Sequence, residues 1–131
     1  MANKFKLSIV TADGKKLVDD AEILNVVTSS GTLGIMAHHL PLIAVIEISH
    51  LNYKKDNQVY EFSISGGVLS VNNNEVSILA DAFESKEEID FTRAEEAKNR
   101  AENRLKSKEI NIDIKRAELS LKRALNRLSM R

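Results

Sequence analysis

The amino-acid sequence predicts an α+β fold in which an N-terminal antiparallel β-sandwich is followed by a C-terminal two-helix antiparallel hairpin. Three observations support this prediction. Apolar residues alternate with polar ones in the first part of the chain, they recur every three or four residues in the last part, and the net charge changes sign between the two. We place the sandwich domain at residues 1–84 and the hairpin domain at residues 85–131.

The first part of the chain has the period of β-strands. In KFKLSIV, at residues 4–10, apolar side chains fall at alternate positions, which is typical of a half-buried strand. Turn sequences at 13–14, 54–57 and 72–74 separate further runs with strand character: EILNVV, QVYEFSI, GVLSV and EVSILA. Short strands joined by tight turns favour antiparallel pairing in two stacked layers, over about residues 3–83.

After Ala82 the apolar period becomes that of a helix. The segment SKEIN, at residues 107–111, is short enough to fold two helices back on each other. Each helix has one apolar stripe surrounded by charge, and we expect small residues of the first stripe to receive large residues of the second. The stripes are Ala94, Ala97, Ala101 and Leu105, and then Ile114, Ala117, Leu121, Leu125 and Leu128.

The two stripes are thin for a hydrophobic core. Two helices of this length, with about five apolar contacts each, are marginally stable by themselves. The hairpin is therefore expected to be a movable part of the protein. A hairpin docked permanently on the sandwich is the alternative.

The hexapeptide Ile-Asp-x-x-Arg-Ala occurs twice, at residues 89–94 and 112–117. With the aspartate at the N-cap, its carboxylate can accept backbone N–H groups of the first turn, and the Ile and Ala take the two positions of a hydrophobic staple. The repeat is thus explained as a helix start, except for its arginines, whose charge opposes the helix dipole. Ser85 and Glu88 have capping-box spacing and offer an alternative start for the first helix.

Four arginines need a separate explanation. If the helices fold back, the early part of the first lies beside the late part of the second, and the four guanidinium groups can converge. Such a cluster is unfavourable unless an anion joins it, and a polyphosphate suits the fork geometry of arginine. Alternatively, they lie on a solvated basic face and pair with neighbouring glutamates. The residues are Arg93, Arg100, Arg123 and Arg127.

The composition and the apolar runs argue against disulfides, thiolate metal sites, membrane spans and a signal peptide. The absence of cysteine excludes disulfides and thiolate zinc sites. The longest apolar run, at 40–48, contains a glutamate and is about half the length that spans a bilayer, and the N-terminus lacks the pattern of a signal peptide. We therefore expect a soluble protein, or one that reaches a membrane only through a partner.

Catalysis and nucleic-acid binding are both disfavoured. The histidines, His38, His39 and His50, do not have metal-pair spacing, and SGG at 65–67 lacks the strand-to-helix context of a phosphate loop. These glycines more plausibly let two backbones approach. Residues 89–131 carry a net charge of +5 against −5 for residues 1–88, but acidic residues are interleaved and the chain has only two tyrosines and no tryptophan for stacking on bases.

Several stretches in order resemble the epsilon-subunit family of bacterial F-type ATP synthases, over essentially the whole chain. In the sandwich, these are the first hairpin and a Gly-x-x-Gly-(I/V)-x-x-x-His-x-Pro-Leu type of segment, followed by the last strands. In the hairpin, both helices match. The stretches read IVTADGKKL, SGTLGIMAHHLPL, SISGGVLSV, VSILADAFE, IDFTRAEEAKNRAENRL and RAELSLKRALNRL. The departures are Ala12 and Ala37, where proline is usual, and His38, where glycine is usual.

The resemblance implies a non-catalytic subunit of a proton-translocating complex, peripheral to the cell membrane on its cytoplasmic side. The sandwich would contact the gamma subunit and the ring of c subunits. The helices would either fold down or extend toward the alpha and beta subunits and inhibit ATP hydrolysis. Nucleic acid is not among the implied partners, and no metal or required cofactor is implied.

In several bacilli-like members of the family, the folded-down hairpin binds ATP as a regulatory ligand. The resemblance assigns adenine and ribose recognition to Glu84, Ile89, Asp90 and Ala94. It assigns the phosphates mainly to Arg100, Arg123 and Arg127, with support from Arg93. This pattern indicates a sensor of the ATP level. The alternative is the same rotor subunit acting only through protein contacts, with no nucleotide bound.

Overall fold

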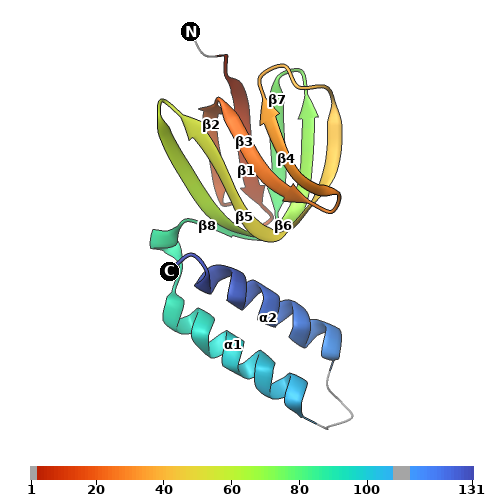
Figure 1. Ribbon diagram of the computed structural model, residues 1–131, viewed down its shortest axis with the longest axis vertical. Helices are drawn as coiled ribbons and strands as arrows, with labels where there is room; N and C mark the ends of the chain where they lie inside the picture. Colours follow the sequence, from red (N-terminus) through yellow and green to blue (C-terminus); the bar gives the residue numbers. More distant parts are fainter. Residues whose placement is uncertain (1–2, 108–112) are drawn as a thin grey trace. The chain divides into compact units, whose positions relative to one another are not determined.

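The computed structural model describes residues 3–107 and 113–131 (Figure 1). The chain divides into two compact units, Met1–Ser85 and Lys86–Arg131. The division lies one residue beyond the boundary placed from the sequence. The first unit holds the β-strands and the second holds both α-helices.

The first unit is built from eight strands in one continuous sheet with the order β2-β1-β7-β6-β5-β3-β4, and β8 pairs with β6. Neighbouring strands are antiparallel except β1 and β7, which are parallel. The predicted sandwich is confirmed, with this one parallel pair as the departure from the antiparallel pairing that the sequence favoured. Parallel pairing needs a long connection between the two strands. Here β2 to β6 come between β1 and β7 in the sequence. The strands are β1 (Phe5–Thr11), β2 (Lys16–Ala21), β3 (Ile23–Thr28), β4 (Gly31–Met36), β5 (Leu42–Lys55), β6 (Gln58–Asn72), β7 (Glu75–Ala80) and β8 (Phe83–Glu84).

Two long strands, β5 and β6, let a single sheet form both layers of the sandwich (Figure 1). The sequence suggested two strands, QVYEFSI and GVLSV, where the structure has β6 alone. Its glycines keep the strand continuous: Gly66 has a φ of +92°, and a Cβ on Gly67 would lie 2.4 Å from the carbonyl oxygen of Leu79. The prediction that these glycines allow a close backbone approach is confirmed.

The core lies between the layers and follows the alternation seen in the sequence. In β1 the side chains of Phe5, Leu7 and Ile9 are buried, and in β7 those of Val76 and Ile78 face the same core. Polar neighbours on each strand face outward. The predicted half-buried strand at the start of the chain is confirmed.

A polar cluster joins β2 to β5 at the edge of the core. The Tyr53 hydroxyl donates to Asp19 Oδ2 at 2.9 Å, and Lys55 Nζ donates to Asp19 Oδ1 at 2.5 Å. Burial, followed by the hydrogen bond to Asp19, raises the pKa of the Tyr53 phenol. Burial acts to raise the pKa of Asp19 as well, but the hydrogen bonds from Lys55 and Tyr53 outweigh it and hold this pKa below its usual range.

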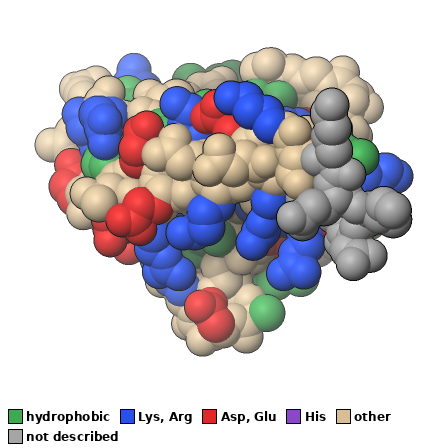
Figure 2. All heavy atoms as spheres, turned by 90° about the horizontal axis from the view of Figure 1, so that it is seen from below, with side chains coloured by type: hydrophobic (Ala, Val, Ile, Leu, Met, Phe, Trp, Pro, Cys, Tyr) green, Lys and Arg blue, Asp and Glu red, His purple; other side chains and the backbone are tan. Residues whose placement is uncertain are grey.

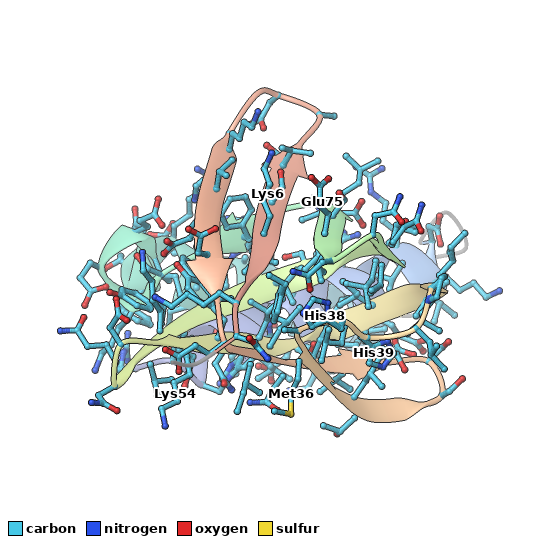
Figure 3. All side chains as sticks on the ribbon, turned by 90° about the horizontal axis from the view of Figure 1, so that it is seen from above. Lys6, Met36, His38, His39, Lys54 and Glu75 are labelled. Atoms are coloured by element: carbon cyan, nitrogen blue, oxygen red, sulfur yellow. The ribbon has the colours of Figure 1, made fainter. Side chains whose placement is uncertain are left out.

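The loop after β4 contains Ala37 and His38, two of the three departures from the family pattern. His38 takes a φ of +62°, so it adopts the left-handed conformation for which glycine is the usual residue. Its backbone N–H donates to Asn74 Oδ1 at 2.7 Å, and Asn74 Nδ2 donates to the carbonyl of Lys4. Figure 3 shows His38 and His39 on this loop, and Lys6 and Glu75 on the adjacent strands β1 and β7, where the two residues are paired in register. Asn74 thus ties the loop to the first strand.

The second unit is a short 3-10 turn, Lys86–Glu88, followed by α1 (Phe91–Lys106) and α2 (Ile114–Leu128). Asp90 and Asp113 are the two N-caps, so the helix starts predicted from the repeated hexapeptide are confirmed. The alternative start at Ser85 is not used for α1. The predicted break at 107–111 falls between the helices, and all of it but Ser107 lies outside the described residues, as does Ile112.

An alanine seam joins α1 and α2. Four alanines have an exposed fraction of 4% or less: Ala94 and Ala101 on α1, and Ala117 and Ala124 on α2. Each pair is seven residues apart, which is the repeat of a supercoiled helix pair. The expected stripe of α2 is wrong in part, because Ile114 and Leu125 are exposed, whereas Ala124, outside that stripe, is buried. Four small buried side chains allow close approach of the two backbones.

Candidate nucleotide site on the helical hairpin

The two helices are antiparallel, so the start of α1 lies beside the end of α2 (Figure 1). The guanidinium carbon of Arg131 lies 5.2 Å from the centroid of the Phe91 ring, and this contact aligns the two ends. With a rise of about 1.5 Å per residue, Arg93 and Arg127 lie close to the end of the hairpin where α1 begins and α2 ends. Arg100 is roughly 13 Å along α1 from Phe91, and Arg123 is roughly 8 Å back along α2 from Leu128, so both lie further from that end.

The arginines also share one side of the hairpin. Arg93, Arg100 and Arg123 each precede a seam alanine by one residue, and so does Arg116, which lies near the start of α2. An antiparallel pair has an approximate two-fold axis perpendicular to its plane, so equivalent positions beside the seam fall on the same side. Arg127 is four residues after Arg123 and lies on the same side, closer to the open end of the hairpin, where α1 begins and α2 ends. The convergence expected from the sequence is thus consistent with the helix pairing.

The surface around these arginines is strongly charged. Arg93 and Arg100 are exposed, while Arg123 and Arg127 are half-buried. One acidic residue that could have paired with an arginine, Glu95, instead lies 3.8 Å from Lys98 Nζ. Figure 2 shows basic side chains spread over the face it views, with acidic ones between and beside them. Where several guanidinium groups converge on such a surface, they favour a polyanion.

Asp90 is fixed by its role as a helix cap. Its Oδ1 accepts from the backbone N–H of Arg93 at 3.0 Å, and Asp113 makes the same bond to Arg116 at 3.0 Å. Capping therefore accounts for the aspartate of both hexapeptides. The cap hydrogen bond involves one carboxylate oxygen of Asp90. The carboxylate lies at the open end of the hairpin, where α1 begins.

The two apolar residues of the hexapeptide are largely covered. Ile89 is 6% exposed and Ala94 is 4% exposed, as the predicted staple requires. Glu84 is in the first unit, where it pairs with Ser63 through β8 and is half-buried. The residues that the sequence analysis assigned to phosphates are thus all in the second unit, while one assigned to adenine and ribose is in the first.

Two contacts were not anticipated from the sequence. Arg131 and Phe91 join the helix ends, and Lys15 Nζ donates to the carbonyl of Phe83 at 2.5 Å. Neither belongs to a spacing pattern, because each links residues that are distant in the sequence. For the first contact, the sequence offered only an aromatic residue at the start of one helix, Phe91, and a basic residue after the end of the other, Arg131.

The first unit has an apolar row on its outer face. Val45, Val68 and Leu79 are direct cross-strand neighbours on β5, β6 and β7, and each is about half exposed. A hollow lined by residues 28–33 and 42–45 lies beside the β3–β4 turn. Within residues 3–107 and 113–131, neither helix is long and apolar enough to cross a membrane.

Comparison with known proteins covers nearly the whole chain. The family model for the ATP synthase delta/epsilon chain β-sandwich domain matches residues 4–86, and the model for the long alpha-helix domain of the same chain matches residues 87–130. The ATP synthase epsilon chain of Bacillus velezensis is 46% identical over 95% of each chain, and that of Bacillus subtilis is 46% identical over the same shares. That of Halalkalibacterium halodurans is 45% identical over 95% of this chain and 94% of the relative.

Among solved structures, a chain in the cryo-EM structure of Euglena gracilis mitochondrial ATP synthase aligns with a TM-score of 0.80. It is 20% identical, and the alignment covers 94% of this chain and 78% of that one. A chain in the central stalk and c-ring structure from Tetrahymena thermophila aligns with a TM-score of 0.59 at 14% identity, covering 98% of this chain and 93% of that one. At these identities the structures support the fold.

Proposed function

This chain belongs to the delta/epsilon family of ATP synthase subunits, as a non-catalytic stalk subunit, and we propose that its C-terminal hairpin binds ATP as a sensor of the ATP level. The proposed ligand is ATP itself, acting as a regulator and not as a substrate. The proposed contacts are Glu84, Ile89, Asp90, Arg93, Ala94, Arg100, Arg123 and Arg127.

One observation supports this proposal: each helix buries two alanines that are seven residues apart. With these alanines at the seam of an antiparallel pair, helix periodicity would bring the four arginines to one side, with Arg93 and Arg127 near the end where α1 begins and Arg100 and Arg123 further along. Each guanidinium can donate two parallel hydrogen bonds to phosphate oxygens, and such charge-assisted bonds are roughly twice as strong as neutral ones. A triphosphate lying along this side would meet them in turn.

The proposed mechanism is a shift between two states of the hairpin. A seam of alanines buries little apolar area, so the closed pair is only weakly favoured over an open one. ATP needs arginines from both helices and therefore binds only the closed pair. ATP shifts the equilibrium between the closed and the open hairpin by the difference between its affinities for the two forms. When ATP is scarce, the hairpin opens, and the same basic residues become available to acidic surfaces of the alpha and beta subunits, where the helices inhibit hydrolysis.

For the first unit we propose a role in the rotor. The apolar row of Val45, Val68 and Leu79 suits contact with the gamma subunit, because half-exposed aliphatic side chains in one row gain from burial. The hollow beside the β3–β4 turn suits contact with the ring of c subunits. These contacts would hold the protein at the cytoplasmic side of the cell membrane, as a peripheral part of the proton-translocating complex.

Titration of the isolated chain with ATP tests the sensor directly. Isothermal titration calorimetry should show one saturable site in the wild type. The double variant Arg123→Ala/Arg127→Ala removes two charge-assisted contacts and should weaken binding roughly 100-fold.

A matched control removes two charges from the opposite face of the same helix. Lys115→Ala/Lys122→Ala changes the net charge by the same amount at two exposed positions, and should leave the affinity within about threefold of the wild type. Equal losses in both double variants would mean that only general electrostatic attraction is at work. An unchanged affinity in Arg123→Ala/Arg127→Ala would refute the assignment of these residues. No binding by the wild type would favour the rotor subunit that acts through protein contacts alone.

A further inference from the structure

The turn between β1 and β2 is rigid and presents Lys15 in a defined direction. The backbone N–H of Thr11 donates to the carbonyl of Lys15 at 3.0 Å, and the N–H of Lys15 donates to Thr11 Oγ1 at 3.1 Å. The N–H of Gly14 donates to the carbonyl of Thr11, and Gly14 takes the φ of +100° that this turn requires. Three hydrogen bonds within five residues leave the turn little freedom.

The side chain of Lys15 crosses from this turn to β8. Its Nζ donates to the carbonyl of Phe83 at 2.5 Å and lies 4.4 Å from the centroid of the Phe83 ring. One ammonium group therefore makes both a charge-assisted hydrogen bond and a cation–π contact with the same residue. The Phe83 ring is buried and packs edge-to-face on Phe62, with 5.9 Å between centroids. Phe83 is thus held by Phe62 and by Lys15.

This contact acts on the segment that leads out of the first unit. Strand β8 consists of Phe83 and Glu84 alone, and the second unit begins at Lys86. A strand of two residues has few ladder hydrogen bonds with which to hold itself in a sheet. The contact from Lys15, which joins residues 68 apart in the sequence, adds a tie between β8 and the β1–β2 turn.

We propose that Lys15 is a positioning residue for ATP binding: it fixes β8 and so fixes the backbone of Glu84. The inference rests on the proposed function, since Glu84 is one of the proposed contacts. Lys15 itself does not touch ATP in this scheme. It acts through the backbone of Phe83, the residue that precedes Glu84.

The test compares two lysines at the same turn. Lys15→Met keeps the aliphatic stem and removes the charge and the donor, and Lys16→Met makes the same change at an adjacent exposed position. Calorimetric titration with ATP should show a roughly three- to tenfold weaker affinity for Lys15→Met, and no change for Lys16→Met. Hydrogen exchange without nucleotide should show faster exchange at the amides of residues 84–86 in Lys15→Met alone.

A double-mutant cycle separates positioning from a general loss of structure. If Lys15 acts through Glu84, then Lys15→Met should have no further effect on ATP affinity in a Glu84→Ala background. If the two losses add instead, Lys15 does not act through Glu84 and the inference is wrong.

The cycle also distinguishes this inference from the proposed function. Wild-type binding with an unchanged affinity in Lys15→Met would overturn the positioning role and leave the sensor intact. If the wild type does not bind ATP, the sensor fails and the nucleotide part of the inference fails with it. The exchange rates at residues 84–86 then decide whether Lys15 orders β8: faster exchange in Lys15→Met supports this, and unchanged exchange contradicts it.

Discussion

The backbone N–H of His38 donates to the side-chain oxygen of Asn74 across 2.7 Å, and this bond holds a histidine in a left-handed conformation. The φ of +62° at His38 places its Cβ close to its own backbone, which costs about 1 kcal/mol or more for a residue other than glycine. Asn74 is itself left-handed, at a φ of +59°, but asparagine tolerates this conformation better. The loop therefore stores strain at one position.

His38→Gly should relieve this strain. Glycine adopts the left-handed region without steric cost but gains freedom in the unfolded chain, so the net stabilisation should be a few tenths to about 1 kcal/mol. Urea unfolding of the two proteins measures it. His39→Gly is the matched control, because the structure gives His39 no positive φ, and it should destabilise the protein. If His38→Gly proved less stable than the wild type, the His38 side chain would have a stabilising role.

Asp19 should make the first unit sensitive to acid. Hydrogen bonds from Lys55 and Tyr53 outweigh the effect of burial and hold the pKa of Asp19 below its unfolded value of about 3.9. Its contribution to stability is therefore fully present above that unfolded value and is lost as the pH falls through the folded pKa. Asp19→Asn should cost about 1 kcal/mol at neutral pH, and this difference should shrink below pH 4. Urea unfolding of both proteins at a series of pH values checks this, and a difference independent of pH would contradict it.

The alanine seam should not tolerate a large residue. Ala101 is 2% exposed against the facing helix, and Ala101→Leu would force the helices apart at a cost of about 1 to 3 kcal/mol. In the proposed mechanism only the closed hairpin binds ATP, so the apparent affinity for ATP should fall in proportion to the closed population. Asn103→Leu, at an exposed position of the same helix, is the control. Circular dichroism melts and ATP titrations measure the two effects, and equal behaviour of the two variants would show that the seam does not hold the hairpin.

The repeated hexapeptide offers a comparison within one chain. Asparagine caps helices as well as aspartate, so Asp90→Asn and Asp113→Asn should both preserve their helix starts. If Asp90 contacts the nucleotide, Asp90→Asn should weaken ATP binding about tenfold, and Asp113→Asn should not. Titration of each variant with ATP gives the answer. The same affinity for both variants would mean that Asp90 is only a cap.

Local patterns in the sequence predicted the features that depend on neighbouring residues. The alternation in β1, the N-caps at Asp90 and Asp113 and the close approach at Gly67 follow from backbone chemistry within a few positions. The side shared by the arginines also follows from helix periodicity, once the helices are taken as antiparallel.

Features set by distant residues were missed. The parallel pairing of β1 with β7 depends on which strands fill the sheet between them. The choice of Ala124 over Leu125 for the seam depends on the rotation of α2 against α1, because both residues fit a helical stripe. Lys15 gave no signal, since its partner Phe83 is 68 residues away.

The most direct test of the sensor is hydrogen exchange of the seam amides in the wild-type chain, with and without ATP. If ATP binds only the closed hairpin, saturating ATP should slow exchange at Ala94, Ala101, Ala117 and Ala124. At 100 times the dissociation constant, the added protection should be about 2.7 kcal/mol. The strands of the first unit serve as the internal reference. Exchange at the four alanines that is identical with and without ATP would contradict the claim that the nucleotide closes the hairpin.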